Sequence, residues 1–241
     1  MRAPAAAILA MAAIALLPAC TTSNPGTAAP TSTTASSTPA PSKCSYQPKD
    51  PTADDKDAGL PTGSESTAGS VTLRTNQGEI KISLSGTAAP CTVRSFVHLV
   101  EKQYFDGTKC HRLTLANGLK VLQCGDPTAT GRGGPGYTIP DENPTDLKPG
   151  PPGPDGSPTA IYPRGIVAMA RTGAPHSGGS QFFLVHGNST LKASYATFGT
   201  VDEAGLAVLD KIAAGGVVAR AGPEDGTPKL DVTIKQAVVG P

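Results

Sequence analysis

The sequence contains no tryptophan, and all aromatic residues together make up only 4% of its 241 residues. Charge of one sign is also lacking, because 20 Lys and Arg residues against 19 Asp and Glu residues leave a formal net charge of +1. Such a chain has no strong electrostatic attraction to phosphate backbones, so we expect no nucleic-acid partner. Cys-x-x-Cys pairs are absent and the four histidines lack ligand-like spacing. We therefore expect no metal and no cofactor.

The N-terminal apolar run is too short to cross a membrane. Arg2 precedes apolar residues 3–17, and Leu17-Pro18-Ala19-Cys20 follows them. A charge, a short apolar core and small residues predict a secretory signal peptide over residues 1–20, cleaved before Cys20. A cysteine at this place resembles the bacterial lipobox, which implies lipid on Cys20 and anchoring to the extracytoplasmic face of the cell membrane. The alternative is an ordinary signal peptide in which Cys20 is accidental.

Large apolar side chains are almost absent from the next segment. Residues 21–43 are mainly Thr, Ser, Pro and Ala, which cannot bury enough surface to offset the entropy of ordering the chain. Residues 44–69 carry more charge and no periodicity, with a local contact around Cys44 and Tyr46 as one possibility. We therefore predict a disordered tether over residues 21–65 and one folded domain over residues 66–241.

Four cysteines remain beyond Cys20, and export would allow them to form disulfides. Four cysteines permit three complete pairings, among which a sequence cannot choose. The alternative is that they are buried thiols that pack as small apolar side chains. These residues are Cys44, Cys91, Cys110 and Cys124.

The hydrophobic patterns of the domain predict a mostly β fold with two helices. Apolar residues with a helical period predict helices over 92–103 and over 203–214, the second ending at Gly215. Alternating residues around tight turns predict two hairpins, and further strands follow. The predicted strands contain residues 71–73 and 80–84 on either side of the turn 76–78, and then cover residues 109–115, 119–124, 165–170, 181–186, 196–201 and 230–239. Residues 126–164 lack periodicity and are predicted to be a long loop.

Three short motifs occur in an order and at separations that are typical of one protein family. They are Cys110-His111-Arg112, Gln123-Cys124-Gly125-Asp126 and Gly179-Ser180-Gln181-Phe182-Phe183. From about Ser70 to the C-terminus the chain resembles the cyclophilin family of peptidyl-prolyl cis-trans isomerases. The resemblance implies a closed eight-stranded antiparallel β-barrel capped by two α-helices. It also implies that the partners are polypeptides that contain proline. Because the signal peptide predicts export, we expect the enzyme to assist the folding of exported proteins.

The resemblance assigns roles to residues of this chain. Arg112 would donate hydrogen bonds to the twisted X-Pro amide, Gln123 would bind both Arg112 and the substrate backbone, and Phe183 would form the floor of the proline pocket. Phe182 has the opposite strand parity and should lie in the core. Further substrate-binding residues are expected to be His111, Val121, Ala170, Arg171, Gln181, Leu191 and Tyr195. His111 is alternatively a structural residue.

The departures from the family concern the walls of the site. Ten residues separate Arg112 from Gln123, more than in many relatives, so the usual pocket phenylalanine falls on either Leu119 or Lys120. The glycine-rich run 131–136 lacks the Lys-Ser/Thr of a phosphate loop and is predicted to be a flexible loop beside the groove. A non-catalytic binding module or holdase for proline peptides is the alternative function. The retained Arg112 favours a catalyst, which we expect to be monomeric.

Overall fold

The computed structural model describes residues 44–62, 66 and 68–241. The predicted signal peptide, Cys20 and residues 21–43 of the predicted tether lie outside the described residues. No helix in the described part of the chain is long and apolar enough to span a bilayer.

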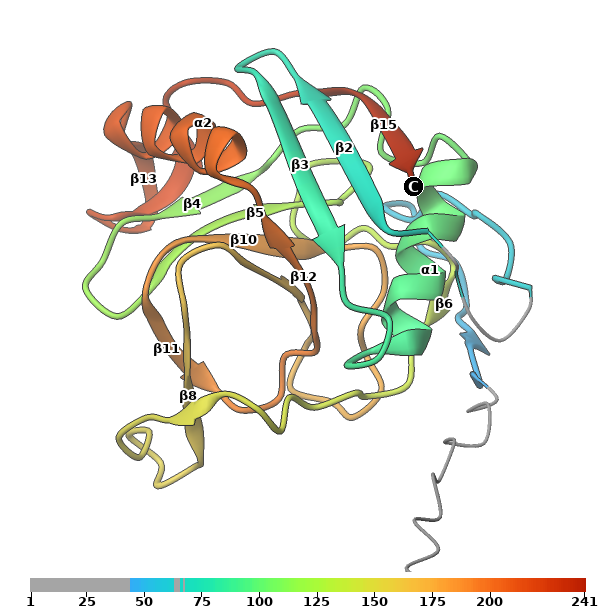
Figure 1. Cartoon of the computed structure of the whole chain (residues 1–241), viewed down its shortest axis with the longest axis horizontal. Helices are drawn as coiled ribbons and strands as arrows, with labels where there is room; N and C mark the ends of the chain where they lie inside the picture. The colour runs from blue at the N-terminus through green and yellow to red at the C-terminus, as the bar shows by residue number, and fades with distance from the viewer. Residues whose placement is uncertain (1–43, 63–65, 67) are drawn as a thin grey trace, which may run out of the picture. The chain divides into compact units, whose positions relative to one another are not determined.

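Ten antiparallel strands form the main sheet. Their order across the sheet is β13-β14-β4-β5-β10-β9-β12-β3-β2-β15. Their bounds are β2 Ser70–Thr75, β3 Glu79–Leu84, β4 Arg112–Thr114, β5 Lys120–Cys124, β9 Ile166–Met169, β10 Phe182–Gly187, β12 Thr197–Val201, β13 Val217–Gly222, β14 Asp225–Pro228 and β15 Ile234–Gly240. The helices α1 (Pro90–Glu101) and α2 (Glu203–Ala214) lie on opposite sides of the β2–β3 hairpin (Figure 1). The prediction of a mostly β fold with two helices is confirmed.

The main sheet is not closed, which corrects the prediction of an eight-stranded barrel. Within the described residues, β13 and β15 each pair with a single neighbour and form the two edges. The reason is the β13–β14 hairpin, which adds two strands beyond β4 through the pairing of Gly226 with Leu113. An isolated bridge joins Lys109, just before β4, to Thr233, just before the edge strand β15, so the chain still comes together there.

Helix α2 occupies the residues that its sequence pattern predicts. The side chain of Asp202 accepts a hydrogen bond from the backbone N–H of Gly205 at 2.8 Å, which satisfies one of the free donors of the first turn. Gly215 follows the last helical residue as the C-cap. Helix α1 begins two residues earlier than predicted, at Pro90, because proline is well suited to the first turn of a helix.

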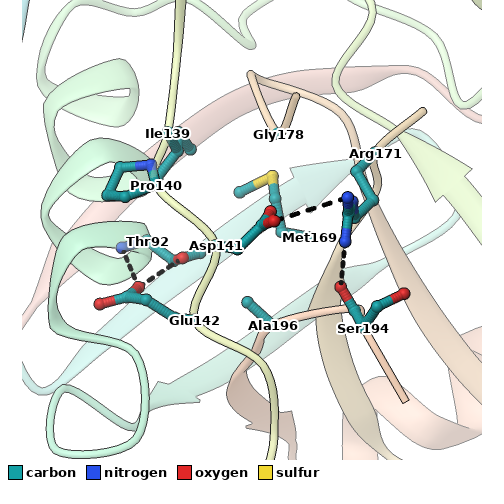
Figure 2. A pocket seen from close by; sticks show the side chains of 10 residues that line it. All are labelled: Thr92, Ile139, Pro140, Asp141, Glu142, Met169, Arg171, Gly178, Ser194 and Ala196. Atoms are coloured by element: carbon teal, nitrogen blue, oxygen red, sulfur yellow. Dashed lines mark hydrogen bonds and ion pairs between the residues drawn. The ribbon is translucent and has the colours of Figure 1, made fainter. Parts of the chain in front are cut away.

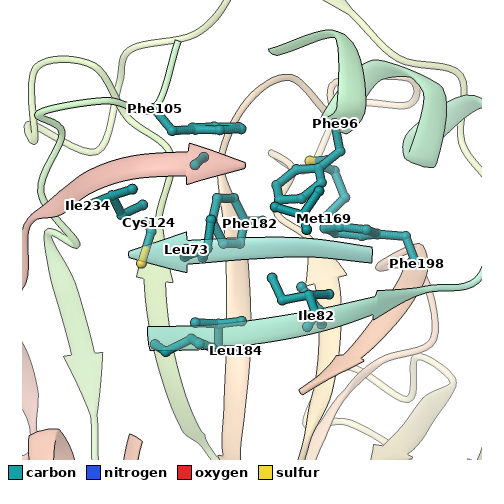
Figure 3. Close-up of a cluster of buried hydrophobic side chains, with 14 of the residues drawn as sticks. Leu73, Ile82, Phe96, Phe105, Cys124, Met169, Phe182, Leu184, Phe198 and Ile234 are labelled. Atoms are coloured by element: carbon teal, nitrogen blue, oxygen red, sulfur yellow. The ribbon is translucent and has the colours of Figure 1, made fainter. Parts of the chain in front are cut away.

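Two apolar clusters lie on opposite faces of the sheet. Strand β10 contributes to both, because successive side chains on a strand point to opposite faces. Phe182 belongs to the larger cluster, where its ring centroid lies 5.1 Å from that of Phe96 of α1 (Figure 3). Phe183 belongs to the smaller cluster, which we call the pocket cluster. Its buried members are Val121, Ala160, Tyr162, Ala168, Phe183 and Val185.

Residues 44–62 form an ordered segment on the domain, which we call the strap. The disulfide Cys44–Cys91 joins it to α1, and β1 (Gln47–Pro48) pairs with β6 (Tyr137–Thr138). The described part of the predicted tether is therefore part of the folded domain. Backbone hydrogen bonds and a covalent bond hold it in place, and neither requires the apolar periodicity that the sequence lacks there.

The predicted loop over residues 126–164 contains three short strands. Besides β6, these are β7 (Lys148–Pro149) and β8 (Thr159–Tyr162). Strand β8 lies between β7 and β11 (Ser189–Lys192) in a small separate sheet. Residues 159–162 therefore reach the segment that carries the predicted pocket residue Leu191, which pairs with Ala160.

Candidate active site

Three predicted site residues form one row across neighbouring strands. In the antiparallel register, Arg112 of β4 lies opposite Gln123 of β5, and Gln123 lies opposite Phe183 of β10. Directly opposite residues share a face of the sheet, so these three side chains lie on the face of the pocket cluster. The Nη1 of Arg112 donates a hydrogen bond to Oε1 of Gln123 at 3.4 Å.

Asp225 holds the guanidinium of Arg112 from the other side. The Nε of Arg112 donates to Oδ1 of Asp225 at 2.8 Å, and Nη2 donates to Oδ2 at 2.7 Å. This bidentate geometry fixes the plane of the guanidinium as well as its position. The hydrogen bonds lower the pKa of Asp225 and raise the pKa of Arg112. Both groups are therefore charged at neutral pH.

A chain of amide groups continues the row on the side of Gln123. Its Nε2 donates to Oε1 of Gln181 at 2.9 Å, and Nε2 of Gln181 donates to the carbonyl oxygen of Gly133 at 3.0 Å. Each amide thus has a defined orientation, because one end accepts while the other donates. Gln181 therefore lies next to the row of Arg112, Gln123 and Phe183.

Apolar side chains surround Phe183, which is only 4% exposed. Its ring centroid lies 5.5 Å from that of Tyr195 in an edge-to-face arrangement, a favourable geometry for two aromatic rings. Val121 belongs to the same pocket cluster, and partly buried apolar residues pack against this cluster. These include the predicted residues Ala170, Leu191 and Tyr195, and also Leu119. Leu119 rather than Lys120 therefore takes the apolar place that the sequence left open.

Tyr162 of β8 fixes the segment that carries Tyr195. Its hydroxyl lies 3.0 Å from the carbonyl oxygen of Lys192, to which it donates, and accepts from the backbone N–H of Tyr195 at 3.2 Å. Its ring also packs in the pocket cluster, with its centroid 6.4 Å from that of Phe183. Burial raises the pKa of Tyr162 to about 12, so the hydroxyl keeps its proton at neutral pH.

Comparison with known proteins decides the family. The family "Cyclophilin type peptidyl-prolyl cis-trans isomerase/CLD" matches residues 70–239. This chain is a cyclophilin. A "Probable peptidyl-prolyl cis-trans isomerase B" of Mycobacterium leprae is 49% identical over 166 residues, which are 69% of this chain and 55% of that protein. A "Peptidyl-prolyl cis-trans isomerase B" of Streptomyces anulatus is 37% identical over 185 residues, covering 70% of this chain and 94% of that protein.

Solved cyclophilins share the fold. A crystal structure of a Cryptosporidium parvum cyclophilin type peptidyl-prolyl cis-trans isomerase has a TM-score of 0.56 and 26% identity. The match covers 72% of this chain and 98% of that one. A second structure of that protein was determined in the presence of the dipeptide Ala-Pro. This cyclophilin spans about half the length of two mycobacterial proteins named probable peptidyl-prolyl cis-trans isomerase B, 55% of the Mycobacterium leprae protein and 54% of the Mycobacterium tuberculosis protein.

Two predicted substrate-binding residues of this cyclophilin lie apart from the row. His111 is 8% exposed, and its Nδ1 has no hydrogen-bond partner among the described residues. It lines a separate cavity of about 200 Å³ with Lys109, Arg220 and Thr227. Burial lowers the pKa of His111, so its ring is neutral at neutral pH. The structure does not place His111 beside Phe183.

Arg171 is the second of these residues, and its guanidinium serves internal contacts. It is paired with Asp141 at 3.5 Å and donates to the carbonyl oxygen of Ser194 at 3.4 Å (Figure 2). It also donates to the carbonyl oxygen of Ala174 at 2.7 Å. Its side chain is 13% exposed. Arg171 thus braces the residue before Tyr195, and few of its donors are left for a substrate.

Glu142, next to Asp141, has a structural role at α1. Its carboxylate accepts from the backbone N–H groups of Cys91 at 2.9 Å and Thr92 at 2.8 Å, and from the hydroxyl of Thr92 at 2.7 Å. A carboxylate at a helix N-terminus satisfies free donors and interacts favourably with the helix dipole. The N-cap residue Ala89 offers no side-chain acceptor of its own.

Sequence reasoning missed Asp225 and Tyr162, and it placed the glycine-rich run 131–136 beside the groove without singling out Gly133. The signal for Asp225 was an Asp-Gly pair, in which Gly226 allows close strand contact, since a Cβ there would collide with the carbonyl oxygen of Val218. Tyr162 had no signal, because its strand lies in a segment without periodicity.

The described part of the chain contains no group of three or more His, Cys, Asp or Glu residues that could hold a metal ion.

Proposed function

We propose that this chain is a peptidyl-prolyl cis-trans isomerase that assists the folding of exported proteins. The observation that carries the proposal is the row of Arg112, Gln123 and Phe183, in which a fixed cationic donor shares one face of the sheet with a buried aromatic ring. Relatives that bear this activity in their names, and the Ala-Pro dipeptide present with a solved cyclophilin, support the same substrate class.

The geometry suits a reaction in which no bond is broken. Amide resonance gives X-Pro rotation a barrier of about 18–20 kcal/mol, so a catalyst must favour the twisted amide over the planar one. The proline ring would pack on Phe183, with Val121, Leu191 and Tyr195 around it. Arg112, at the opposite end of the row from Phe183, would donate a hydrogen bond to the carbonyl of the twisted amide.

Arg112 keeps free donors for this task. A guanidinium has five N–H groups. Asp225 takes one from Nε and one from Nη2, and Gln123 takes one from Nη1, which leaves one N–H on each terminal nitrogen. Because Asp225 and Gln123 fix the guanidinium before substrate arrives, little reorganisation is needed in the transition state.

A protease-coupled isomerisation assay with an Ala-Pro peptide tests this function. We expect Arg112→Ala to lower kcat/KM by about two orders of magnitude, the effect of removing one preorganised donor. The matched control is Arg164→Ala, which breaks an equally close bidentate pair with Asp210 on the surface. Full activity of the Arg112→Ala variant would contradict the assignment.

The second candidate is a non-catalytic binding module for proline peptides, which the Ala-Pro dipeptide of the solved relative would equally suit. A binding module needs the pocket cluster and has no need of Arg112. Peptide binding by the parent protein, together with an isomerisation rate equal to the uncatalysed one, would support this second candidate. The bidentate Arg112–Asp225 pair, which fixes a donor that simple peptide binding does not require, favours the enzyme.

We further propose that the mature protein begins at Cys20, carries lipid there and acts as a monomer outside the cytoplasm. The disulfides Cys44–Cys91 and Cys110–Cys124 support an oxidising compartment. Mass spectrometry of the mature N-terminus tests the lipid, and size-exclusion chromatography tests the monomer. An unmodified N-terminus at another residue would contradict the lipid anchor.

A further inference from the structure

The strap lies outside the family match, yet it contacts the active-site surroundings. The match begins at residue 70, whereas the strap comprises residues 44–62. Three of its backbone N–H groups donate to one short segment, residues 131–137, which we call the glycine loop. The bonds are Lys49 to Gly136 at 2.9 Å, Lys56 to Gly134 at 3.0 Å and Ala58 to Pro135 at 3.1 Å.

Side chains add to this contact between the strap and the glycine loop. The carboxylate of Asp54 accepts from Nε of Arg132 at 3.0 Å. On the inner side, the buried carboxylate of Asp126 accepts from the backbone N–H groups of Gly131 and Gly133. A Cβ on Gly133 would collide with both Asp126 and the carbonyl oxygen of Asp54. The loop backbone is thus held between the strap and Asp126, which corrects the prediction of a flexible loop.

The glycine loop is linked by hydrogen bonds to the row of Arg112, Gln123 and Phe183. The carbonyl oxygen of Gly133 accepts from Gln181, whose other amide atom accepts from Gln123, the partner of Arg112. Gly133 lies between two residues, Arg132 and Gly134, that the strap itself binds. The orientation of Gln181 therefore depends on a carbonyl whose position the strap and Asp126 determine together.

The strap is in turn fixed to α1 near both of its ends. Cys44 is joined to Cys91 by a disulfide, and the carbonyl oxygen of Thr62 accepts from Nε of Arg94 at 2.6 Å. Between these points, the ring of Tyr46 packs edge-to-face on Tyr137 of the glycine loop, with centroids 5.8 Å apart. The segment is therefore clamped between the helix and the glycine loop along its length.

We propose that the strap is a positioning element of the active site. It holds the glycine loop so that Gly133 orients Gln181 for contact with the substrate backbone, and the Cys44–Cys91 disulfide keeps it in place. This inference rests on the proposed isomerase function. It predicts that loosening the strap weakens substrate binding more than it lowers kcat, the rate of isomerisation of the bound substrate. The reason is that Gln181 contacts Arg112 only through Gln123 in the hydrogen-bond chain.

Variants of the full chain test the strap without removing it. Asp54→Ala breaks the ion pair with Arg132, and the double variant Cys44→Ser with Cys91→Ser removes the covalent bond to α1. For both we expect KM and the dissociation constant of an Ala-Pro peptide to rise about fivefold, with kcat within about twofold of the parent. The matched control is Asp210→Ala, which breaks a surface ion pair of similar length with Arg164 and should change neither quantity.

Circular dichroism and the NMR signals of the Gln181 side-chain amide accompany these measurements. We expect an unchanged spectrum and shifted Gln181 signals in both variants. Parent-like KM, peptide affinity and Gln181 signals would overturn the inference, and so would a loss confined to kcat. If the parent protein itself does not catalyse isomerisation, the proposed function fails, while peptide affinity and the Gln181 signals still decide the role of the strap.

Discussion

Replacing Asp225 by alanine should lower kcat/KM by about tenfold, because Arg112 would lose the partner that fixes its plane. The two charge-assisted hydrogen bonds are short, but the Arg112 and Asp225 side chains are 39% and 22% exposed, so solvent screens the pair. Freed from Asp225, the arginine regains part of about 2 kcal/mol of rotamer entropy. A cost of about 1.4 kcal/mol in the transition state corresponds to the tenfold loss.

Two further variants make this prediction specific. Asp225→Asn keeps one acceptor oxygen, so we expect a loss of only about threefold, or about 0.6 kcal/mol. The double variant Arg112→Ala with Asp225→Ala should be no slower than Arg112→Ala alone, because Asp225 acts through the arginine. The assay is the protease-coupled reaction, with thermal unfolding of each variant measured in parallel.

Two results would refute this reasoning. An Asp225→Ala variant as active as the parent would show that Arg112 does not need its carboxylate partner. A more active variant would show that Asp225 restrains the guanidinium from the substrate. The pH dependence gives an independent check: the pKa of Asp225 is lowered, so the ion pair persists at neutral pH and is lost only as pH falls through that lowered pKa. Activity should therefore be constant from about pH 6 to 9.

Three further predictions concern the pocket and stability. Phe183→Ala should impair catalysis and lower the melting temperature, with a loss of about 3–5 kcal/mol in the free energy of unfolding. Phe182→Ala should lower the free energy of unfolding by a similar amount but leave more activity per folded molecule. Tyr162→Phe should raise KM in peptide titrations, because the segment carrying Tyr195 loses its hydrogen bonds; an unchanged KM would contradict this role. The pKa of buried His111 is lowered, so the unfolded state binds more protons and the melting temperature should fall as pH drops below about 6.5. His111→Gln should reduce that slope.

The features that the sequence predicted have local causes. Helix α2 needs only its own apolar face, the acceptor of Asp202 and the stop at Gly215. The row of Arg112, Gln123 and Phe183 followed from family motifs, and strand parity separated Phe183 from Phe182. The helix signals and the strand parity lie within a few residues of the feature that they specify, whereas the meeting of three distant strands in the row came from the family resemblance alone.

The features that were missed depend on contacts between distant segments. The β13–β14 hairpin has little alternation, since most of β13 is exposed, and its pairing with β4 leaves the sheet open at that edge. The contact expected around Cys44 and Tyr46 is present, because Cys44 is bonded to Cys91 and Tyr46 donates to the carbonyl oxygen of Cys91. The rest of the strap is held largely by backbone groups, which every residue has, and so it shows no apolar periodicity. The pairing of Cys44 with Cys91 likewise follows from where the strap lies rather than from spacing.

Strand β15 runs beside β2 over its whole length, so the end of the chain meets the start of the family domain. Gly240 pairs with Ser70, and the hydroxyl of Ser70 donates to the carbonyl oxygen of Pro241 at 3.3 Å. A short peptide could therefore join these two points, and a new N-terminus could be opened in the exposed residues between β7 and β8. Such a circularly permuted protein would keep every strand pairing of the main sheet while changing the order in which the ribosome makes them.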